Sequence, residues 1–238
     1  MTARSGRDIR VVDDPAAEAA KRIAAAVRGA GHIALAGGST PKRAYGLTAE
    51  MELDWSAATV WFGDERCVPE DDENSNYRMA KEALLDRIEG ERPAVKPIAG
   101  ERGPHAAAGD YEAELRATLH EELPRLDLIL LGLGPDAHTA SLFPNQPSLD
   151  ATDQLAFGVE EAGMEPHVPR VTLTLPAINA ARQVVFLIEG AGKAEAVARA
   201  FGAEPGPDAP ASLVSPGAGE LIVLLDEPAA AQLPEEAR

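Results

Sequence analysis

The stretch that decides the fold is Asp127-Leu128-Ile129-Leu130-Leu131-Gly132-Leu133-Gly134-Pro135-Asp136-Ala137-His138-Thr139-Ala140-Ser141-Leu142-Phe143-Pro144. It opens as a continuous apolar run, which predicts a strand buried on both faces of a parallel sheet. It then breaks into glycines and places Asp, His, Thr and Ser side chains within six positions. Ligands of open α/β sheets bind just beyond the carboxyl ends of strands, so we expect a functional site here. The glycines alone favour an ordinary tight turn, and the histidine alone also fits a helix cap.

Apolar runs and helical segments alternate along the rest of the chain. We expect strands at 9–12, 32–36, 59–62, 126–131, 155–159, 170–175, 183–188 and 221–225, and helices at 15–28, 41–50, 75–88, 104–122 and 194–201. This alternation predicts an α/β fold with a mostly parallel, doubly wound sheet and helices on both faces. We find no internal repeat and no clear linker, so we expect one domain over residues 1–238, with a mobile tail from 228 to 238.

Composition limits the classes of function. The chain has 238 residues and 45% hydrophobic content, enough for a large core, and its one cysteine, Cys67, rules out an intramolecular disulfide. No apolar stretch approaches the roughly 20 residues of a membrane span, and the N-terminus lacks a signal-peptide core, so we expect a cytoplasmic protein. A net charge of −17 argues against binding to nucleic acid or anionic membranes. An anionic substrate would need local positive charge or backbone N–H groups in its pocket.

A second cluster, Gly37-Gly38-Ser39-Thr40-Pro41, follows the strand expected at 32–36. Glycines let the backbone approach an anion closely, and a helix that starts at Pro41 would direct free N–H groups toward it. Ser39 and Thr40 add hydroxyl donors. Taken alone, these residues fit an ordinary strand-to-helix turn with Thr40 as N-cap about equally well.

Arg66, Arg170 and Lys193 are candidates for the positive charge that an anionic substrate would need. Gly63-Asp64-Glu65-Arg66 follows the strand at 59–62, and the planar guanidinium of Arg66 suits phosphate or carboxylate. The acidic pair before it also fits a solvated turn. Arg170 begins an alternating strand, and Lys193 stands near a helix N-terminus, where a cation opposes the helix dipole unless an anion lies between them. Each cation alone is common on surfaces, but together they could supply the required positive charge.

Residues 132–144 resemble the loop of the 6-phosphogluconolactonase family, which reads Gly-x-Gly-x-Asp-Gly-His-Thr-Ala-Ser-Leu-Phe-Pro. The chain departs from this pattern only at Ala137, where the family usually has Gly. A glycine there suits a positive φ that alanine tolerates poorly, which leaves the exact loop geometry open. The Gly-Gly-Ser-Thr-Pro, Asp-Glu-Arg, Arg-x-Thr and Gly-x-x-Lys elements resemble the same family, so the likeness extends from residue 37 to residue 193.

The resemblance implies a modified Rossmann-like fold, shared with glucosamine-6-phosphate deaminases. It also implies hydrolysis of 6-phosphoglucono-δ-lactone to 6-phosphogluconate in the oxidative pentose phosphate pathway. We expect His138 to act as general base on water, because imidazole titrates near working pH, and Asp136 to orient its ring. Backbone N–H groups of the glycine loops, together with Arg66, would stabilise the oxyanion. The substrate-binding residues implied by the resemblance are Gly37, Gly38, Ser39, Thr40, Asp64, Arg66, Asn76, Gly132, Gly134, Arg170 and Lys193.

Two other functions are less consistent with these residues. Amino-sugar-phosphate isomerases and deaminases share the Gly-x-Gly-x-Asp-Gly-His start but continue into Ile-Ala-Phe-Asn-Glu-Pro, and residues 139–144 contain no counterpart of that Glu. A non-catalytic phosphosugar-binding module could lose His138, yet the chain keeps it beside Asp136.

No cofactor is expected. The other histidines and Cys67 lack metal-ligand spacing, so we predict no catalytic metal. Residues 36–40 lack the Gly-x-Gly-x-x-Gly spacing of a dinucleotide site, so we predict no NAD binding. Oligomeric state, kinetic rates and the preferred lactone ring form stay open.

Overall fold

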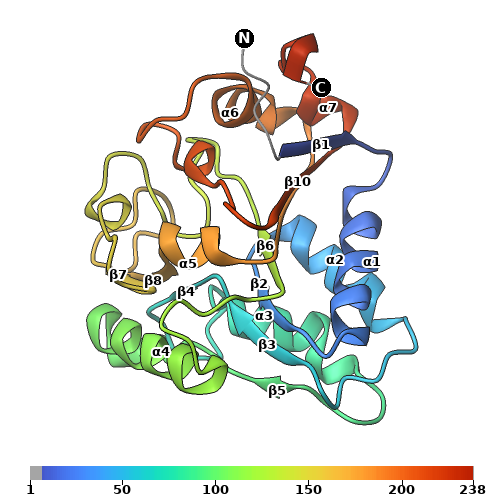
Figure 1. Ribbon diagram of the computed structural model, residues 1–238, viewed down its shortest axis with the longest axis vertical. Helices are drawn as coiled ribbons and strands as arrows, with labels where there is room; N and C mark the ends of the chain where they lie inside the picture. The colour runs from blue at the N-terminus through green and yellow to red at the C-terminus, as the bar shows by residue number, and fades with distance from the viewer. Residues whose placement is uncertain (1–6, 238) are drawn as a thin grey trace.

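The computed structural model describes residues 7–237, and its centre is a seven-stranded parallel sheet (Figure 1). The strands, in spatial order, are β1 (Arg7–Val11), β10 (Glu220–Leu225), β9 (Gln183–Ile188), β6 (Leu128–Leu131), β2 (His32–Leu35), β3 (Thr59–Phe62) and β5 (Ala94–Val95). Each neighbouring pair is parallel. The predicted α/β fold with a mostly parallel sheet is confirmed.

Helices flank this sheet on both sides. They are α1 (Pro15–Arg28), α2 (Ser39–Ala49), α3 (Asn76–Ala83), α4 (Pro104–Leu119), α5 (Leu175–Ala180), α6 (Ala194–Val197) and α7 (Glu227–Ala230). Figure 1 shows α1 and α2 together on one side of the sheet, with α4 on the other. None of the helices within residues 7–237 combines the length and the apolar character needed to cross a membrane.

Helix α1 illustrates how the sequence builds this layer. The Asp14 side chain accepts a hydrogen bond from the Ala17 N–H at 2.8 Å, and Pro15 opens the helix. Gly29 caps its other end. The buried face is Ala16, Ala19, Ala20, Ile23, Ala24 and Val27. Burial of Ile23 and Val27 contributes on the order of 1.5–3 kcal/mol each.

The strand β6 is the centre of the architecture, as its apolar run predicted. All four of its residues are buried, and it pairs with β9 on one side and β2 on the other. From β2 the chain continues outward to β3 and β5, and from β6 it continues outward in the opposite direction to β9 and β10. The loops that follow β2 and β6 therefore flank the point where strand order reverses, which is where doubly wound sheets bind ligands.

A second, three-stranded antiparallel sheet was not predicted as a unit. It consists of β4 (Asp64–Arg66), β8 (Arg170–Leu173) and β7 (Ala156–Val159). The chain passes from the main sheet to this small sheet at Gly63, whose N–H donates to the Leu35 carbonyl and whose carbonyl accepts from the Leu173 N–H, both at 2.8 Å. Residues 64–66, just after β3, therefore form a paired strand rather than an open turn.

Several expectations for individual segments need correction. The helix expected at 75–88 ends at Ala83 and is followed by a single 3₁₀ turn, Leu85–Arg87. The helix expected to reach residue 201 is α-helical only to Val197 and then widens into a π turn, Ala198–Gly202. The segment expected to be a mobile tail from residue 228 instead packs Ala229, Ala230 and Leu233 into the core.

Candidate active site

A cavity of about 180 Å³ opens at the carboxyl ends of β2, β3 and β6. Ten of the thirteen residues predicted from the sequence line it: Gly37, Gly38, Asp64, Arg66, Asn76, Gly132, Gly134, His138, Arg170 and Lys193. Asp136 lies directly behind His138. The remaining two, Ser39 and Thr40, do not line the cavity.

His138 and Asp136 form a tight pair. Nδ1 of His138 lies 2.5 Å from Oδ1 of Asp136, which also accepts the His138 backbone N–H at 3.2 Å. Burial acts to raise the pKa of the Asp136 carboxyl, but its hydrogen bond to His138 and the charge of that ring outweigh burial and hold the pKa below its usual value. Because an ionised carboxylate accepts at Nδ1, the proton of a neutral His138 belongs on that nitrogen, and Nε2 is left as the basic one.

The loop around His138 is compact and partly strained. A Cβ on Gly134 would overlap Nδ1 of His138 and lie 2.8 Å from Oδ1 of Asp136, so only glycine fits there. Ala137, which replaces the family glycine, has φ 66° and is fully buried. This left-handed backbone conformation costs alanine about 1 kcal/mol or more. The loop thus keeps the left-handed conformation that a glycine would favour.

The backbone N–H of Gly134 is not available to a substrate. It donates to the His138 carbonyl at 2.9 Å, and the Gly134 carbonyl accepts from the Ala137 N–H at 3.0 Å. We expect N–H groups of both glycine loops to face an oxyanion, and the engaged Gly134 N–H cannot do so. Gly132, which lines the cavity, and the glycine loop after β2 stay predicted sources of such donors.

Helix α2 begins two residues earlier than predicted, at Ser39 instead of Pro41. Its N-cap is Gly38, with φ 110°, and no side chain caps the first turn. This uncapped N-terminus carries the partial positive charge of the helix dipole to the edge of the cavity, where Gly37 and Gly38 form the lining. Ser39 and Thr40 form the first turn of α2 at this edge and do not line the cavity.

Arg66 and Arg170 face each other across the small sheet. They are direct partners in the antiparallel register of β4 and β8. Like charges placed opposite each other destabilise a sheet, and the Nε atoms of both guanidinium groups are buried without a hydrogen-bond partner. Burial lowers the pKa of the Arg170 guanidinium, the Asp64 charge opposes this shift, and the Arg66 charge adds to it. Negative charge on a bound ligand near the two arginines would offset both costs.

Lys193 reaches the same cavity from the main sheet. Its Nζ donates to the Leu133 carbonyl at 2.6 Å, in the loop that precedes His138. Burial lowers the pKa of the Lys193 ammonium below its usual value, and the nearby Asp136 carboxylate opposes that shift. The three predicted cations are therefore brought together around one cavity.

The acidic residues after β3 are buried rather than solvated. Asp64 accepts from Ser141 Oγ at 2.7 Å and from Asn76 Nδ2 at 3.1 Å, so both of its carboxylate oxygens are engaged. Glu65, only 3% exposed, accepts backbone N–H groups of Arg66, Asn76 and Tyr77 at 2.7–2.8 Å. It thereby fixes the start of α3 against β4.

Glu65 is not among the site residues predicted from the sequence. The available signal was an acid between a buried strand and a helix N-terminus, a position that suits carboxylates.

A Cβ on Gly37 would overlap Oδ1 of Asn76, which explains the glycine at that close approach.

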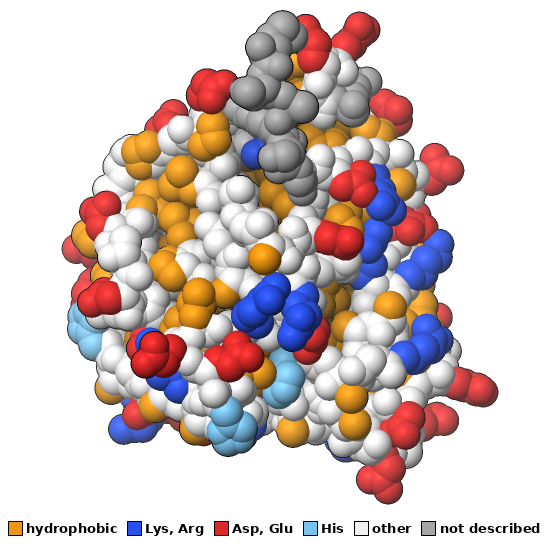
Figure 2. Space-filling view, viewed as in Figure 1, with side chains coloured by type: hydrophobic (Ala, Val, Ile, Leu, Met, Phe, Trp, Pro, Cys, Tyr) orange, Lys and Arg blue, Asp and Glu red, His pale blue; other side chains and the backbone are white. Residues whose placement is uncertain are grey.

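The positive cavity is a local exception on an acidic molecule. Acidic side chains are spread along the outline of the face in Figure 2. A larger hollow of about 1150 Å³ lies near the amino ends of the strands, but its lining includes Glu50, Glu52, Asp54, Asp86, Glu89 and Glu91 against Arg87. Such a lining repels an anionic sugar, so the smaller cavity is the better candidate for its site.

The part of the chain that the structure describes contains no cluster of side chains suited to bind a metal ion. No three His, Cys, Asp or Glu side chains there come together as metal ligands. Burial raises the pKa of the half-buried Cys67 thiol to about 11, so it stays protonated near neutral pH. Independence from metal remains a prediction.

The comparisons with known proteins agree with this geometry. The family described as glucosamine-6-phosphate isomerases/6-phosphogluconolactonase matches residues 8–223. The 6-phosphogluconolactonase of Synechocystis sp. is 44% identical over 215 residues, which cover 88% of each chain. That of Streptomyces coelicolor is 39% identical and is matched over 89% of this chain and 85% of its own.

A solved structure extends the likeness to three dimensions. The 6-phosphogluconolactonase of Trypanosoma brucei superposes with a TM-score of 0.83 at 31% identity, over 96% of this chain and 99% of that one. A monomeric glucosamine-6-phosphate deaminase, at 21% identity and a TM-score of 0.79, shares the fold. The chain therefore belongs to the glucosamine-6-phosphate isomerase/6-phosphogluconolactonase family.

Proposed function

We propose that this protein hydrolyses 6-phosphoglucono-δ-lactone to 6-phosphogluconate. The observation that carries the proposal is the His138–Asp136 pair in the same cavity as Arg66, Arg170 and Lys193. A general base and a group of cations are what a phosphorylated lactone requires. The named relatives, 6-phosphogluconolactonases from two bacteria and a trypanosome, support the same reaction.

The proposed reaction needs one base and one site for negative charge. Nε2 of His138 takes a proton from a water molecule while the water oxygen attacks the lactone carbonyl. The C–O bond to the ring oxygen then breaks, and His138 returns the proton to that leaving oxygen. Asp136 stabilises the imidazolium formed in between and keeps the ring in its productive orientation. A base of this kind contributes roughly 10²–10⁴-fold.

The positive groups of the cavity are divided between the phosphate and the oxyanion. Arg170 and Lys193 bind the phosphate, since Arg170 is buried and Lys193 half-buried, and their hydrogen bonds go to backbone carbonyls rather than to a carboxylate. The oxyanion is stabilised by Arg66 and by backbone N–H groups at the start of α2. No step in this scheme uses a metal, a nucleotide cofactor or a covalent intermediate.

An amino-sugar-phosphate isomerase or deaminase is the alternative that the family allows. Its catalytic set includes a glutamate after the shared histidine motif, and residues 139–144 contain no acid. The corresponding segment here turns Ser141 toward Asp64 instead. The lactone is therefore the favoured substrate, and the amino sugar becomes an outcome of the test.

The test is decay of freshly generated 6-phosphogluconolactone at pH 7 with wild-type protein, with His138→Ala and without protein. We expect acceleration by wild type alone, unchanged after dialysis against EDTA. Acceleration by both proteins would keep the reaction and reject His138 as base. If wild type did not exceed the blank, the lactonase proposal would fail, and glucosamine 6-phosphate would be assayed next.

A further inference from the structure

We infer that Asp226 is a positioning residue that aims Lys193 into the cavity. The inference rests on the proposed function, in which Lys193 binds the substrate phosphate. Asp226 does not line the cavity, and it stands directly after the strand β10. It acts on Lys193 through the backbone of the turn between β9 and α6.

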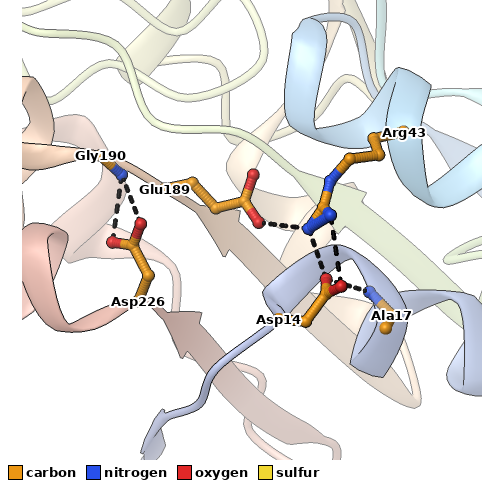
Figure 3. Close-up of polar contacts among 6 residues, drawn as sticks. All are labelled: Asp14, Ala17, Arg43, Glu189, Gly190 and Asp226. Carbon is orange, nitrogen blue, oxygen red and sulfur yellow. Dashed lines mark hydrogen bonds and ion pairs between the residues drawn. The ribbon is translucent and has the colours of Figure 1, made fainter.

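The contact is shown in Figure 3. Both carboxylate oxygens of Asp226 accept the Gly190 N–H, at 3.0 and 2.9 Å. The Gly190 carbonyl in turn accepts the Lys193 N–H at 3.0 Å and closes a single 3₁₀ turn. The Lys193 ammonium then reaches the Leu133 carbonyl at 2.6 Å. Asp226 is therefore connected to Lys193 through hydrogen bonds made by the two sides of Gly190, its N–H and its carbonyl.

This turn needs an external restraint. Gly190 has φ 95°, and a Cβ there would meet no atom within 4 Å, so the backbone has open space on that side. Glycine also has more conformational freedom than any other residue. A carboxylate that accepts the N–H with two oxygens restricts the peptide plane in front of Gly190. That plane sets the direction of the turn and hence the position of Lys193.

A second tether lies beside the first but is weaker. Glu189, in the same turn, accepts from Arg43 of α2 at 2.9 Å, and Arg43 also binds Asp14 at the start of α1 (Figure 3). The Arg43 side chain is 46% exposed. Exposed ion pairs contribute about 0–1 kcal/mol and are screened by salt. Asp226, which binds backbone rather than a mobile side chain, is therefore the residue that the inference selects.

Asp226 has a structural role as well, which the experiment must separate. Its Oδ1 caps α7 by accepting the Ala229 N–H at 2.8 Å. Asp14 makes the matching cap on α1, with the Ala17 N–H at the same distance, and reaches the turn only through Arg43, which also binds Glu189. Asp14→Asn is therefore the control for a weakened cap. Gly190→Ala perturbs the other end of the Asp226 contact and leaves the α7 cap intact.

Gly190→Ala has its own matched control. Gly90 has φ 89°, again with no atom within 4 Å of an added Cβ, and it lies outside the cavity lining. Gly90→Ala imposes the same backbone strain at a distance from the site. Loss of stability common to both alanine variants is then backbone strain, and an effect on the substrate seen only in Gly190→Ala belongs to the turn.

We would measure KM and kcat for lactone hydrolysis, with thermal unfolding of each variant. Asp226→Asn and Gly190→Ala are expected to raise KM about five- to tenfold, the effect of a weakened hydrogen bond to a charged group, with kcat within about twofold. Asp14→Asn and Gly90→Ala are expected to keep the wild-type KM. In a Lys193→Met background, Asp226→Asn should raise KM no further, because it acts through that lysine.

Two results would overturn the inference. One is a wild-type KM in both Asp226→Asn and Gly190→Ala. The other is a KM effect of Asp226→Asn that persists at full size in the Lys193→Met background. Failure of the proposed function is a different result, since wild type itself would then not exceed the blank.

Discussion

The substitution Asp136→Asn separates orientation of the base from its presence. Asparagine keeps the size of the side chain but replaces one carboxylate oxygen by an NH₂ group. If that group faces His138 Nδ1, it forces the proton onto Nε2 and removes the base; if the amide oxygen does, the imidazolium loses its counter-charge. The 2.5 Å contact leaves no room for water to take over this role.

We expect kcat to fall on the order of 10²–10⁴-fold, which corresponds to about 3–5 kcal/mol of barrier. The effect on folding should be much smaller. Because the folded-state pKa of Asp136 is depressed, the carboxylate contributes stability above its ordinary pKa of 3.8, and this contribution is lost as pH falls through the folded value. The Asp136 side chain is 34% exposed, so solvent screening limits the loss to about 1 kcal/mol or less.

The assay is saturated lactone decay at pH 7 with the blank subtracted, combined with thermal unfolding at pH 7 and pH 3. The stability difference between wild type and Asp136→Asn should shrink at the lower pH. A variant that retained wild-type kcat within twofold would refute the orienting role. The same conclusion would follow if Asp136→Asn caused its full loss in a His138→Ala background, where no base remains to be oriented.

Two further outcomes follow from the geometry. Gly134→Ala should abolish turnover, because the added Cβ would overlap His138 and crowd Asp136. Its control, Gly109→Ala, lies in open space on α4 and should keep turnover while stabilising the fold by about 0.5–1 kcal/mol. Equal kcat values in the two variants would contradict the predicted overlap. Burial depresses the pKa of Lys193, so calorimetric affinity for 6-phosphogluconate should decline as pH rises toward 10, below the ordinary lysine value of 10.5. A Lys193→Arg variant should show little such decline, and an equal decline in both proteins would remove Lys193 as its cause.

The main sheet was predictable because its signals are local. The strands β6, β9 and β10 are continuous apolar runs, and α1 carries its own N-cap, N-terminal proline and C-terminal glycine. These features depend on neighbours within a few positions. The strand β4 carries no such signal, since Asp-Glu-Arg is a poor strand sequence by composition. It forms because its partner β8, about a hundred residues away, and the buried Glu65 contacts override local preference.

In the candidate site, too, features set by nearby residues were predictable and features set by distant contacts were not. The motif around His138 predicted the Asp136 contact, since two residues apart in one loop can meet. The role of Gly134 could not be read from composition, because its N–H partner is known only once the loop closes on His138. Ser39 and Thr40 were expected in the cavity as hydroxyl donors and from the family resemblance, but α2 begins at Ser39, and both residues lie in its first turn outside the lining. The contribution of Asp226 depends on the pairing of β9 with β10, which no local pattern encodes.

The division of the cavity between two sheets has a consequence for the lifetime of the protein. Arg66 and Arg170 belong to the small sheet, whereas His138 and Lys193 follow strands of the main sheet, and the chain joins the two at Gly63. A bound phosphosugar would add a further link between the sheets, besides contacts such as Ser141 with Asp64. Ligand at a hundred times its Kd adds about 2.7 kcal/mol to the free energy of unfolding. Resistance to proteolysis should therefore rise and fall with the supply of substrate and product.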